Sequence, residues 1–333
     1  IETQSAILSK YECNIFEYTL KKDIQGKIDE KKGIFFNVQK IEVICFKTGI
    51  GFLVMKTSIE DYQNFANILN FNYKFKSINQ EQTNLDKYDN IRLQTSSFED
   101  VETFREFITG ITGANLGASK LDIDTERFLT YSYVCIDQSA WNHENEFEKI
   151  KHNFEKYALI FPADNSRNIE SKNIKTMSKW KYAKVALSKQ GVMLFSSSAD
   201  MNNYTILPDE YEKQYLYTYI LNLYKKIELK KIEQEFKDPK KVKKARNKFV
   251  EFTRNMWIQE ITEDETGTML NHKIQEALET EKIFAQVKNK YDILYKDLNI
   301  EKNKFATIAI SVVLVASLIF NILNFIMLGI NKL

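Results

Sequence analysis

The spacing of apolar residues changes twice along the chain and divides it into three parts. Residues 1–207 mix short alternating stretches, typical of β-strands, with stretches of helical spacing. Over 208–304 the apolar residues recur every three or four positions, which predicts long helices. The run 305–331 contains no charged residue. We therefore expect an α+β domain, then a helical hairpin with a long stalk, then a C-terminal transmembrane helix over 305–331.

Two hairpins and one central strand are predicted in the first part. Alternating, β-branched stretches lie on both sides of Gly49, as in two strands joined by a tight turn. A second pair of such stretches lies on both sides of Gly191. Both alternating faces of Phe128–Ile136 are apolar, which is typical of a strand in the middle of a covered sheet.

Helices are predicted between and after these strands. Ser58 is suited to cap a helix over Ile59–Leu69. Further helices are predicted over Phe98–Thr109, Asn145–Tyr157, Asp209–Phe236 and Lys240–Ile261. The segment Thr262-Glu263-Asp264-Glu265 is similar to a capping box and begins a last helix. We expect this helix to continue without a break into the uncharged run.

An apolar stripe follows one side of the predicted stalk. Its members are separated by three, four or seven residues and are Phe284, Val287, Tyr291, Leu294, Leu298 and Phe305. An apolar stripe requires cover, so we expect it to face the domain or neighbouring helices. The opposite side is mostly polar and carries Lys282, Gln286, Asn289, Ile293, Lys296 and Ile300.

The 27 uncharged residues between Lys304 and Lys332 contain polar residues on a regular seam. As a helix they would reach about 40 Å, against a hydrocarbon core of about 30 Å. Heptad spacing places eight residues on the seam: Thr307, Ile310, Leu314, Ser317, Asn321, Asn324, Leu328 and Asn331. An unpaired amide in hydrocarbon costs several kcal/mol, so the seam should face other helices or water. It is either the contact face of a self-associating anchor or the lining of a pore, and the repeated Asn favours the pore.

Charge places the expected domains relative to the membrane. Five lysines lie within 20 residues before the uncharged run and only Lys332 follows it. The positive-inside rule then puts the N-terminal domain in the cytoplasm. The abundance of Lys, Asn and Ile is typical of AT-rich bacterial genomes, so we expect a bacterial inner membrane.

Composition argues against several other functions. The net charge of +2 gives no sign of direct nucleic-acid binding, and the three cysteines are too far apart in sequence to suggest a disulfide framework. The chain lacks the G-x-S-x-G, P-loop and H-E-x-x-H motifs, and His143, His152 and His272 have no partners at metal-ligand spacing, so we do not expect an enzyme.

Two short segments are candidates for a ligand or a cation. Gly110, Gly113 and Gly117 lie in a stretch whose backbone amides could cradle a phosphate, the alternative being a flexible loop. Asp122 and Asp124 follow it and could pair with a cation, the alternative being a solvated acidic turn.

A basic run is the remaining charge feature. It comprises Lys225, Lys226, Lys230, Lys231, Lys237, Lys240, Lys241, Lys243, Lys244, Arg246 and Lys248. The run is either a solvated helix face or a contact for anionic lipid head groups or an acidic ligand.

This layout resembles the CorA-type divalent-cation transporter superfamily. The order of α/β domain, long stalk and C-terminal span is similar, and Phe252–Thr262 with Glu265–Leu270 resembles the region that opens the stalk in distant members. Gly329-Ile330-Asn331 stands where the family has a Gly-Met-Asn signature at the outer end of its first span. Ile330 replaces the Met, and the second span usual in the family is missing or not printed.

The resemblance implies a homopentamer with a pore lined by its first spans and a cytosolic funnel that senses a ligand. The diverged signature favours the CorA-like membrane effectors found beside type III CRISPR systems, in which a nucleotide second messenger is thought to open the channel in antiviral defence. A Mg²⁺ or other divalent-cation transporter and a membrane-tethered binding protein without transport are the alternatives. Membrane lipid, further copies of the chain, and a small-molecule ligand such as Mg²⁺ or a nucleotide are the expected partners.

Overall fold

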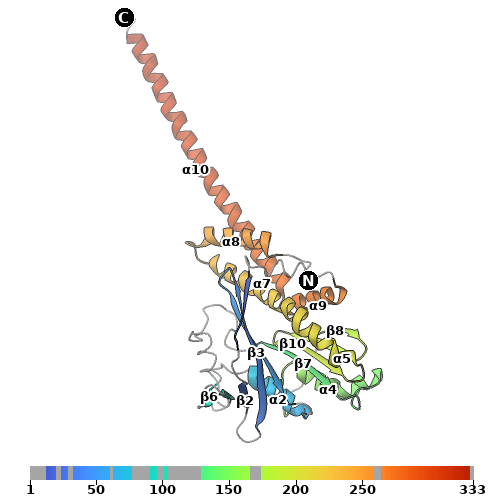
Figure 1. The fold of residues 1–333 in the computed structure, drawn as a ribbon. Helices are drawn as coiled ribbons and strands as arrows, with labels where there is room; N and C mark the ends of the chain where they lie inside the picture. Colours follow the sequence, from blue (N-terminus) through green and yellow to red (C-terminus); the bar gives the residue numbers. More distant parts are fainter. Residues whose placement is uncertain are drawn as a thin grey trace.

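Two β-sheets form the N-terminal part of the computed structural model, and helices form its C-terminal part (Figure 1). The structure describes residues 13–19, 24–28, 33–60, 63–76, 91–95, 101–103, 129–165, 174–257 and 264–330, with backbone alone for 91–95, 101–103, 296–303 and 321–330. The expected α+β architecture with a helical C-terminal region is confirmed.

The first sheet has six strands and is built around β3 (Ile34–Phe46). On one side β3 pairs with β4 (Gly51–Ile59), which confirms the hairpin predicted around Gly49. On its other side β3 pairs with β1 (Cys13–Glu17) and β2 (Ile24–Ile28). The sheet continues from β2 to β5 (Ile91–Thr95) and β6 (Val101–Thr103). Helix α2 (Phe65–Lys76) covers one face, where Phe36 meets Phe71 and Phe75 edge to face.

The second sheet has four strands in the order β7-β10-β9-β8. Their bounds are Thr130–Ile136 for β7, Lys175–Trp180 for β8, Ala183–Ser188 for β9 and Gly191–Ser197 for β10. The β9–β10 hairpin confirms the turn predicted at Gly191, and β7 is parallel to β10.

β7 corrects the predicted central strand, because among the described strands it lies at the edge of its sheet. Its two apolar faces have a different cause. Tyr131 and Tyr133 pack into the cluster under the long helices, whereas Val134 packs on the side of α4 (Phe147–Ala158). Cover by helices on both faces, rather than strands on both sides, therefore explains the pattern. Helix α4 with the preceding turn η2 (Glu144–Glu146) confirms the helix predicted over Asn145–Tyr157.

One predicted helix of the first part is displaced, and another is contradicted where the structure describes it. Ser58 and Ile59 belong to β4, because the β-branched stretch before them continues the ladder with β3. Helix α2 begins only at Phe65, where the Asn64 side chain accepts a hydrogen bond from the Ala66 amide at 3.0 Å. Within the predicted helix Phe98–Thr109, residues Val101–Thr103 form strand β6. The rest of that segment lies outside the described ranges.

The helical part begins with α5 (Asn202–Thr205), α6 (Leu207–Glu210) and the π-helical turn η4 (Tyr211–Tyr215). α7 (Leu216–Glu235) follows at once, so the helix predicted over Asp209–Phe236 is confirmed. α8 (Val242–Asn255) ends earlier than predicted.

The last two helices are separate, which corrects the expectation of one unbroken helix. Asp264 caps α9 (Glu265–Leu278) and accepts from the Gly267 amide at 2.7 Å, so the helix begins within the predicted segment, with Asp264 as its capping residue. Glu279 then has φ +56, in the left-handed region, and ends α9. α10 (Thr280–Ile330) is a new helix of 51 residues.

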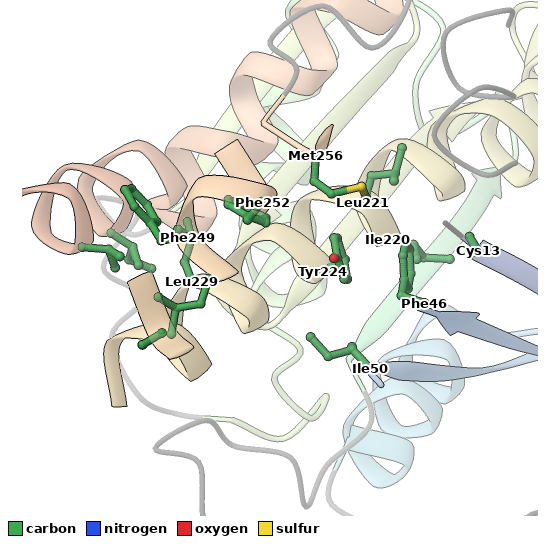
Figure 2. Close-up of a cluster of buried hydrophobic side chains, with 14 of the residues drawn as sticks. Cys13, Phe46, Ile50, Ile220, Leu221, Tyr224, Leu229, Phe249, Phe252 and Met256 are labelled. Carbon is green, nitrogen blue, oxygen red and sulfur yellow. The ribbon is translucent and has the colours of Figure 1, made fainter. Parts of the chain in front are cut away.

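Helix α7 is the centre of the core and is buried on several sides. One cluster brings Ile220, Tyr224 and Leu229 of α7 together with strand residues such as Phe46 and with α8 (Figure 2). A second cluster joins Tyr219 and Leu223 of α7 to β8, β9, β10 and α9. Both sheets and the C-terminal helices therefore pack on the same helix.

Candidate functional site

The first turns of α10 are fixed to the body by aromatic packing. Ile283 and Val287 are buried, and the Trp257 ring stacks on Phe284 with centroids 4.0 Å apart and planes 8° apart. Tyr291 lies against Phe249 at 5.2 Å. Phe284, Val287, Tyr291 and Leu294 thus belong to the α7–α8 cluster, and the predicted orientation of the stripe is confirmed as far as Leu294.

Polar contacts support the same part of α10. Lys290 forms an ion pair with Glu233 of α7. The Arg246 guanidinium of α8 lies over the Tyr291 ring at 5.9 Å and over the Tyr295 ring at 5.1 Å. The predicted polar side agrees with these contacts, because Lys282, Gln286, Asn289 and Ile293 are all exposed.

Beyond these contacts α10 leaves the body (Figure 1). Every side chain from Lys304 to Phe320 is exposed, and the large apolar ones in this stretch expose between 54% and 75% of their surface. Phe305, the last member of the predicted stripe, is 75% exposed, so the cover expected for it is absent among the described residues. Contiguous apolar surface of this extent marks a site of contact with lipid or protein.

The structure describes part of the predicted seam. Thr307, Ile310, Leu314 and Ser317 lie exposed along the helix. Near them the Ser311 hydroxyl, which is off the seam, donates to the Thr307 carbonyl at 2.9 Å, so its polar group is satisfied within the helix. Asn321, Asn324 and Leu328 lie in the helical backbone, with Gly329 and Ile330 in its last turn, and Asn331 lies outside the described ranges.

Other predicted sites fall where the structure gives no description. Gly110, Gly113, Gly117, Asp122 and Asp124 all lie in the gap between 103 and 129. Within the described part of the chain, no group of three or more His, Cys, Asp or Glu residues is placed to hold a metal ion. Among the residues with described side chains, no helix is long and apolar enough to cross a membrane.

Lys225 is buried, contrary to one interpretation of the basic run. It belongs to the basic run, for which a solvated face was one interpretation, yet it is 2% exposed. Its ammonium lies 5.6 Å from the centre of the Trp257 ring. Burial lowers the pKa of this ammonium from 10.5 to about 8, although the Glu281 carboxylate opposes the shift. Helical spacing places Leu221 and Leu229, four residues before and after, on the same side of α7 as Lys225, and this is the sequence signal of its burial.

A second buried charge lies one turn further along α7. Glu228 is 2% exposed, and burial raises the pKa of its carboxyl, while Lys231 lowers it. The Lys231 ammonium is 4.0 Å from this carboxylate and donates to the Thr48 carbonyl at 2.9 Å in the β3–β4 turn. These two residues join α7 to the first sheet.

The tyrosines around the second sheet are structural. Tyr131 stacks on Tyr211 with centroids 4.1 Å apart and donates to the Tyr211 carbonyl at 2.7 Å. The Tyr211 hydroxyl donates to the Val192 carbonyl at 2.9 Å. Burial raises the pKa of both phenols well above the ordinary value, so they stay protonated. Their hydroxyls serve to satisfy backbone carbonyls inside the core.

Comparisons with protein-family models, with curated proteins and with solved structures give no match for this chain. Its candidate site is therefore defined by its own geometry: a helix whose first turns are packed on the body and whose apolar continuation is uncovered in the described structure.

Proposed function

We propose that the chain is a subunit of a CorA-like oligomeric membrane channel gated by a ligand in the cytosol. The observation that carries this proposal is the uncovered part of α10. Its described apolar side chains have no partner within the described chain, whereas one side of the same helix is packed on the body as far as Leu294. Lipid is the environment in which such a surface is stable.

The length of the proposed span comes from the sequence. The uncharged run extends from Phe305 through Asn331, and the backbone of α10 is helical as far as Ile330. Those residues would reach about 40 Å as a helix, enough to cross a hydrocarbon core of about 30 Å with some tilt. On this proposal α10 is both stalk and membrane span.

The seam is the reason to propose several copies. In a lone helix the Asn321 and Asn324 amides would meet hydrocarbon, at a cost of several kcal/mol each if unpaired. Copies arranged around an axis would instead turn them toward each other and toward water. The resemblance to CorA-type proteins favours five copies. Stacked rings of neutral amides would then line a polar path for ions.

Helix α7 supports a route from ligand to pore. It packs against both sheets and also contacts the first turns of α10. A ligand that binds one arrangement of the sheets more tightly than another would therefore bias the position of α10. A nucleotide second messenger is the ligand class that the resemblance favours. Mg²⁺ is the ligand for the alternative, a divalent-cation transporter in which the ion itself sets the gate.

Ion flux through liposomes containing the reconstituted protein tests the proposal. Flux is measured with and without candidate nucleotides and Mg²⁺ for the wild type, for Asn321→Leu/Asn324→Leu and for the control Ile322→Leu/Ile326→Leu. The control changes heptad positions away from the seam. We expect the Asn pair to change flux by tenfold or more and the control to leave it within twofold. Unchanged flux in the Asn variant would refute the assignment of the pore.

The mass of the protein in detergent separates the channel from a membrane-tethered binding protein. The channel predicts a particle of several copies, five by resemblance. A monomer or a dimer would contradict the proposal, because neither can enclose a path with one seam per chain.

A further inference from the structure

Eight of the eleven members of the basic run fall into two sets of four once their contacts are known. One set is used inside the fold: Lys225 is buried, Lys231 binds the β3–β4 turn, Arg246 lies over two tyrosines and Lys248 forms an ion pair with Glu235. The other set is exposed at the corner between α7 and α8. We call Lys237, Lys240, Lys243 and Lys244 the basic corner.

The basic corner has no ion pair among the described residues. The carboxylates in the stretch 237–257 are Asp238, which lies 3.3 Å from the Lys241 ammonium, and Glu251. Lys243 and Lys244 also occupy the first turn of α8, which contains no acidic residue. Cations at a helix N-terminus are disfavoured by the helix dipole, so these lysines do not stabilise their own helix. Among the described residues, these lysines are therefore left exposed and without a carboxylate partner.

The position of the basic corner selects the partner. α8 lies across the end of the body from which α10 projects (Figure 1), and its Arg246 contacts α10 at Tyr295. From Tyr295 to Phe305 the helix rises by about 15 Å. If α10 is inserted as proposed, about 5–7 Å of this rise crosses the head-group layer of the membrane. The remaining gap is close to one Debye length of about 8 Å, a distance over which lysines still attract an anionic surface.

We propose that the basic corner binds anionic lipid head groups of the membrane that α10 enters, and this inference rests on the proposed function. Its role is to hold the body at a fixed height and rotation over the bilayer. A lysine at a membrane surface contributes about fivefold to association with anionic lipid. The four lysines together should therefore produce a clear preference for phosphatidylglycerol over phosphatidylcholine.

Electron spin resonance of spin-labelled lipids tests this in the reconstituted full-length protein. The fraction of motionally restricted lipid is measured with labelled phosphatidylglycerol and with labelled phosphatidylcholine, in phosphatidylcholine vesicles at 0.1 M and 1 M salt. The test variant changes all four lysines of the basic corner to Gln. The matched control changes Lys149, Lys151, Lys175 and Lys181 to Gln, since these are also exposed but lie on α4, on β8 and in the β8–β9 turn.

For the wild type we expect phosphatidylglycerol to be preferred at least threefold at low salt. The test variant should lose at least half of that preference and the control none, while Lys302 and Lys304 account for what remains. An equal preference in wild type and test variant overturns the inference. The inference is also overturned if the wild type shows no preference for phosphatidylglycerol and binds an oligonucleotide through the same four lysines. Absence of any restricted lipid would instead mean that α10 is not inserted, and the proposed function would fail with it.

Discussion

The buried Lys225 ammonium gives a quantitative test of the core beneath α10. Burial lowers its pKa from 10.5 to about 8, and a pKa difference of one corresponds to about 1.4 kcal/mol. The charge therefore costs about 3 kcal/mol of stability at neutral pH. Its contact with the Trp257 ring, which is lost when the charge is removed, returns about 1 kcal/mol. Lys225→Met keeps an unbranched apolar side chain that is one heavy atom shorter and carries no charge, so we expect the variant to be about 2 kcal/mol more stable at pH 7.

The sign of the pH dependence follows from which state holds the proton. Below pH 8 Lys225 is charged in the folded and the unfolded protein, so the cost is complete. As pH rises from 8 to 10.5, the folded protein loses this proton while the unfolded protein keeps it, and the wild type gains stability. The advantage of Lys225→Met should therefore shrink across this window and be lost by pH 10.5.

Urea denaturation in detergent micelles, followed by tryptophan fluorescence, measures both effects. Wild type and Lys225→Met are compared at pH 7 and at pH 10.5, so that other titrating groups cancel between the two proteins. A variant less stable than wild type at pH 7, or an advantage that is equal at both pH values, would refute the argument that a desolvated charge dominates at this position.

Two further substitutions test the packing of the sheet and of the stalk. Gly191→Ala should lower the free energy of unfolding by about 3 kcal/mol or more in the same assay, because the new Cβ would lie 1.8 Å from the Thr130 carbonyl oxygen. In the control Gly49→Ala the new Cβ meets open space, and only the backbone at φ +82 is unfavourable, so this variant should cost about 1 kcal/mol. Trp257→Ala removes the ring stacked on Phe284 and should lower the free energy of unfolding by about 3 kcal/mol. Amide hydrogen exchange should then become faster over 280–295 than over β9 and β10. An equal increase of the exchange rate in both regions would count against a local role for the ring.

Much of the helical region could be predicted because its apolar spacing reflects real burial. The stripe from Phe284 to Leu294 packs as its periodicity requires, and Asp264 caps its helix as its residue type suggests. The break at Glu279 could not be foreseen, since no glycine, asparagine or proline marks it. Its left-handed conformation is supported by tertiary contacts, including an ion pair of Glu279 with Lys189 at 3.0 Å.

Less of the candidate site than of the helical region could be predicted from the sequence. Exposure of the apolar part of α10 follows from its sequence, but Lys225 looks like any other lysine in a basic run. The periodicity of a helix indicates which of its sides is apolar on average. It does not predict whether a single lysine on that side is buried. The role of Asn321 and Asn324 stays a prediction, because facing a pore and facing lipid are compatible with the same heptad positions.

The unequal division of α10 has a mechanical consequence. About a third of its 51 residues, as far as Tyr295, are attached to the body, and the remainder extends about 50 Å beyond the last contact. A tilt of about 5° at the attached end displaces the far end by about 4 Å. A small tilt of α10 where it is attached to α7 and α8 would therefore move the far end of the helix by a distance comparable to the diameter of an ion.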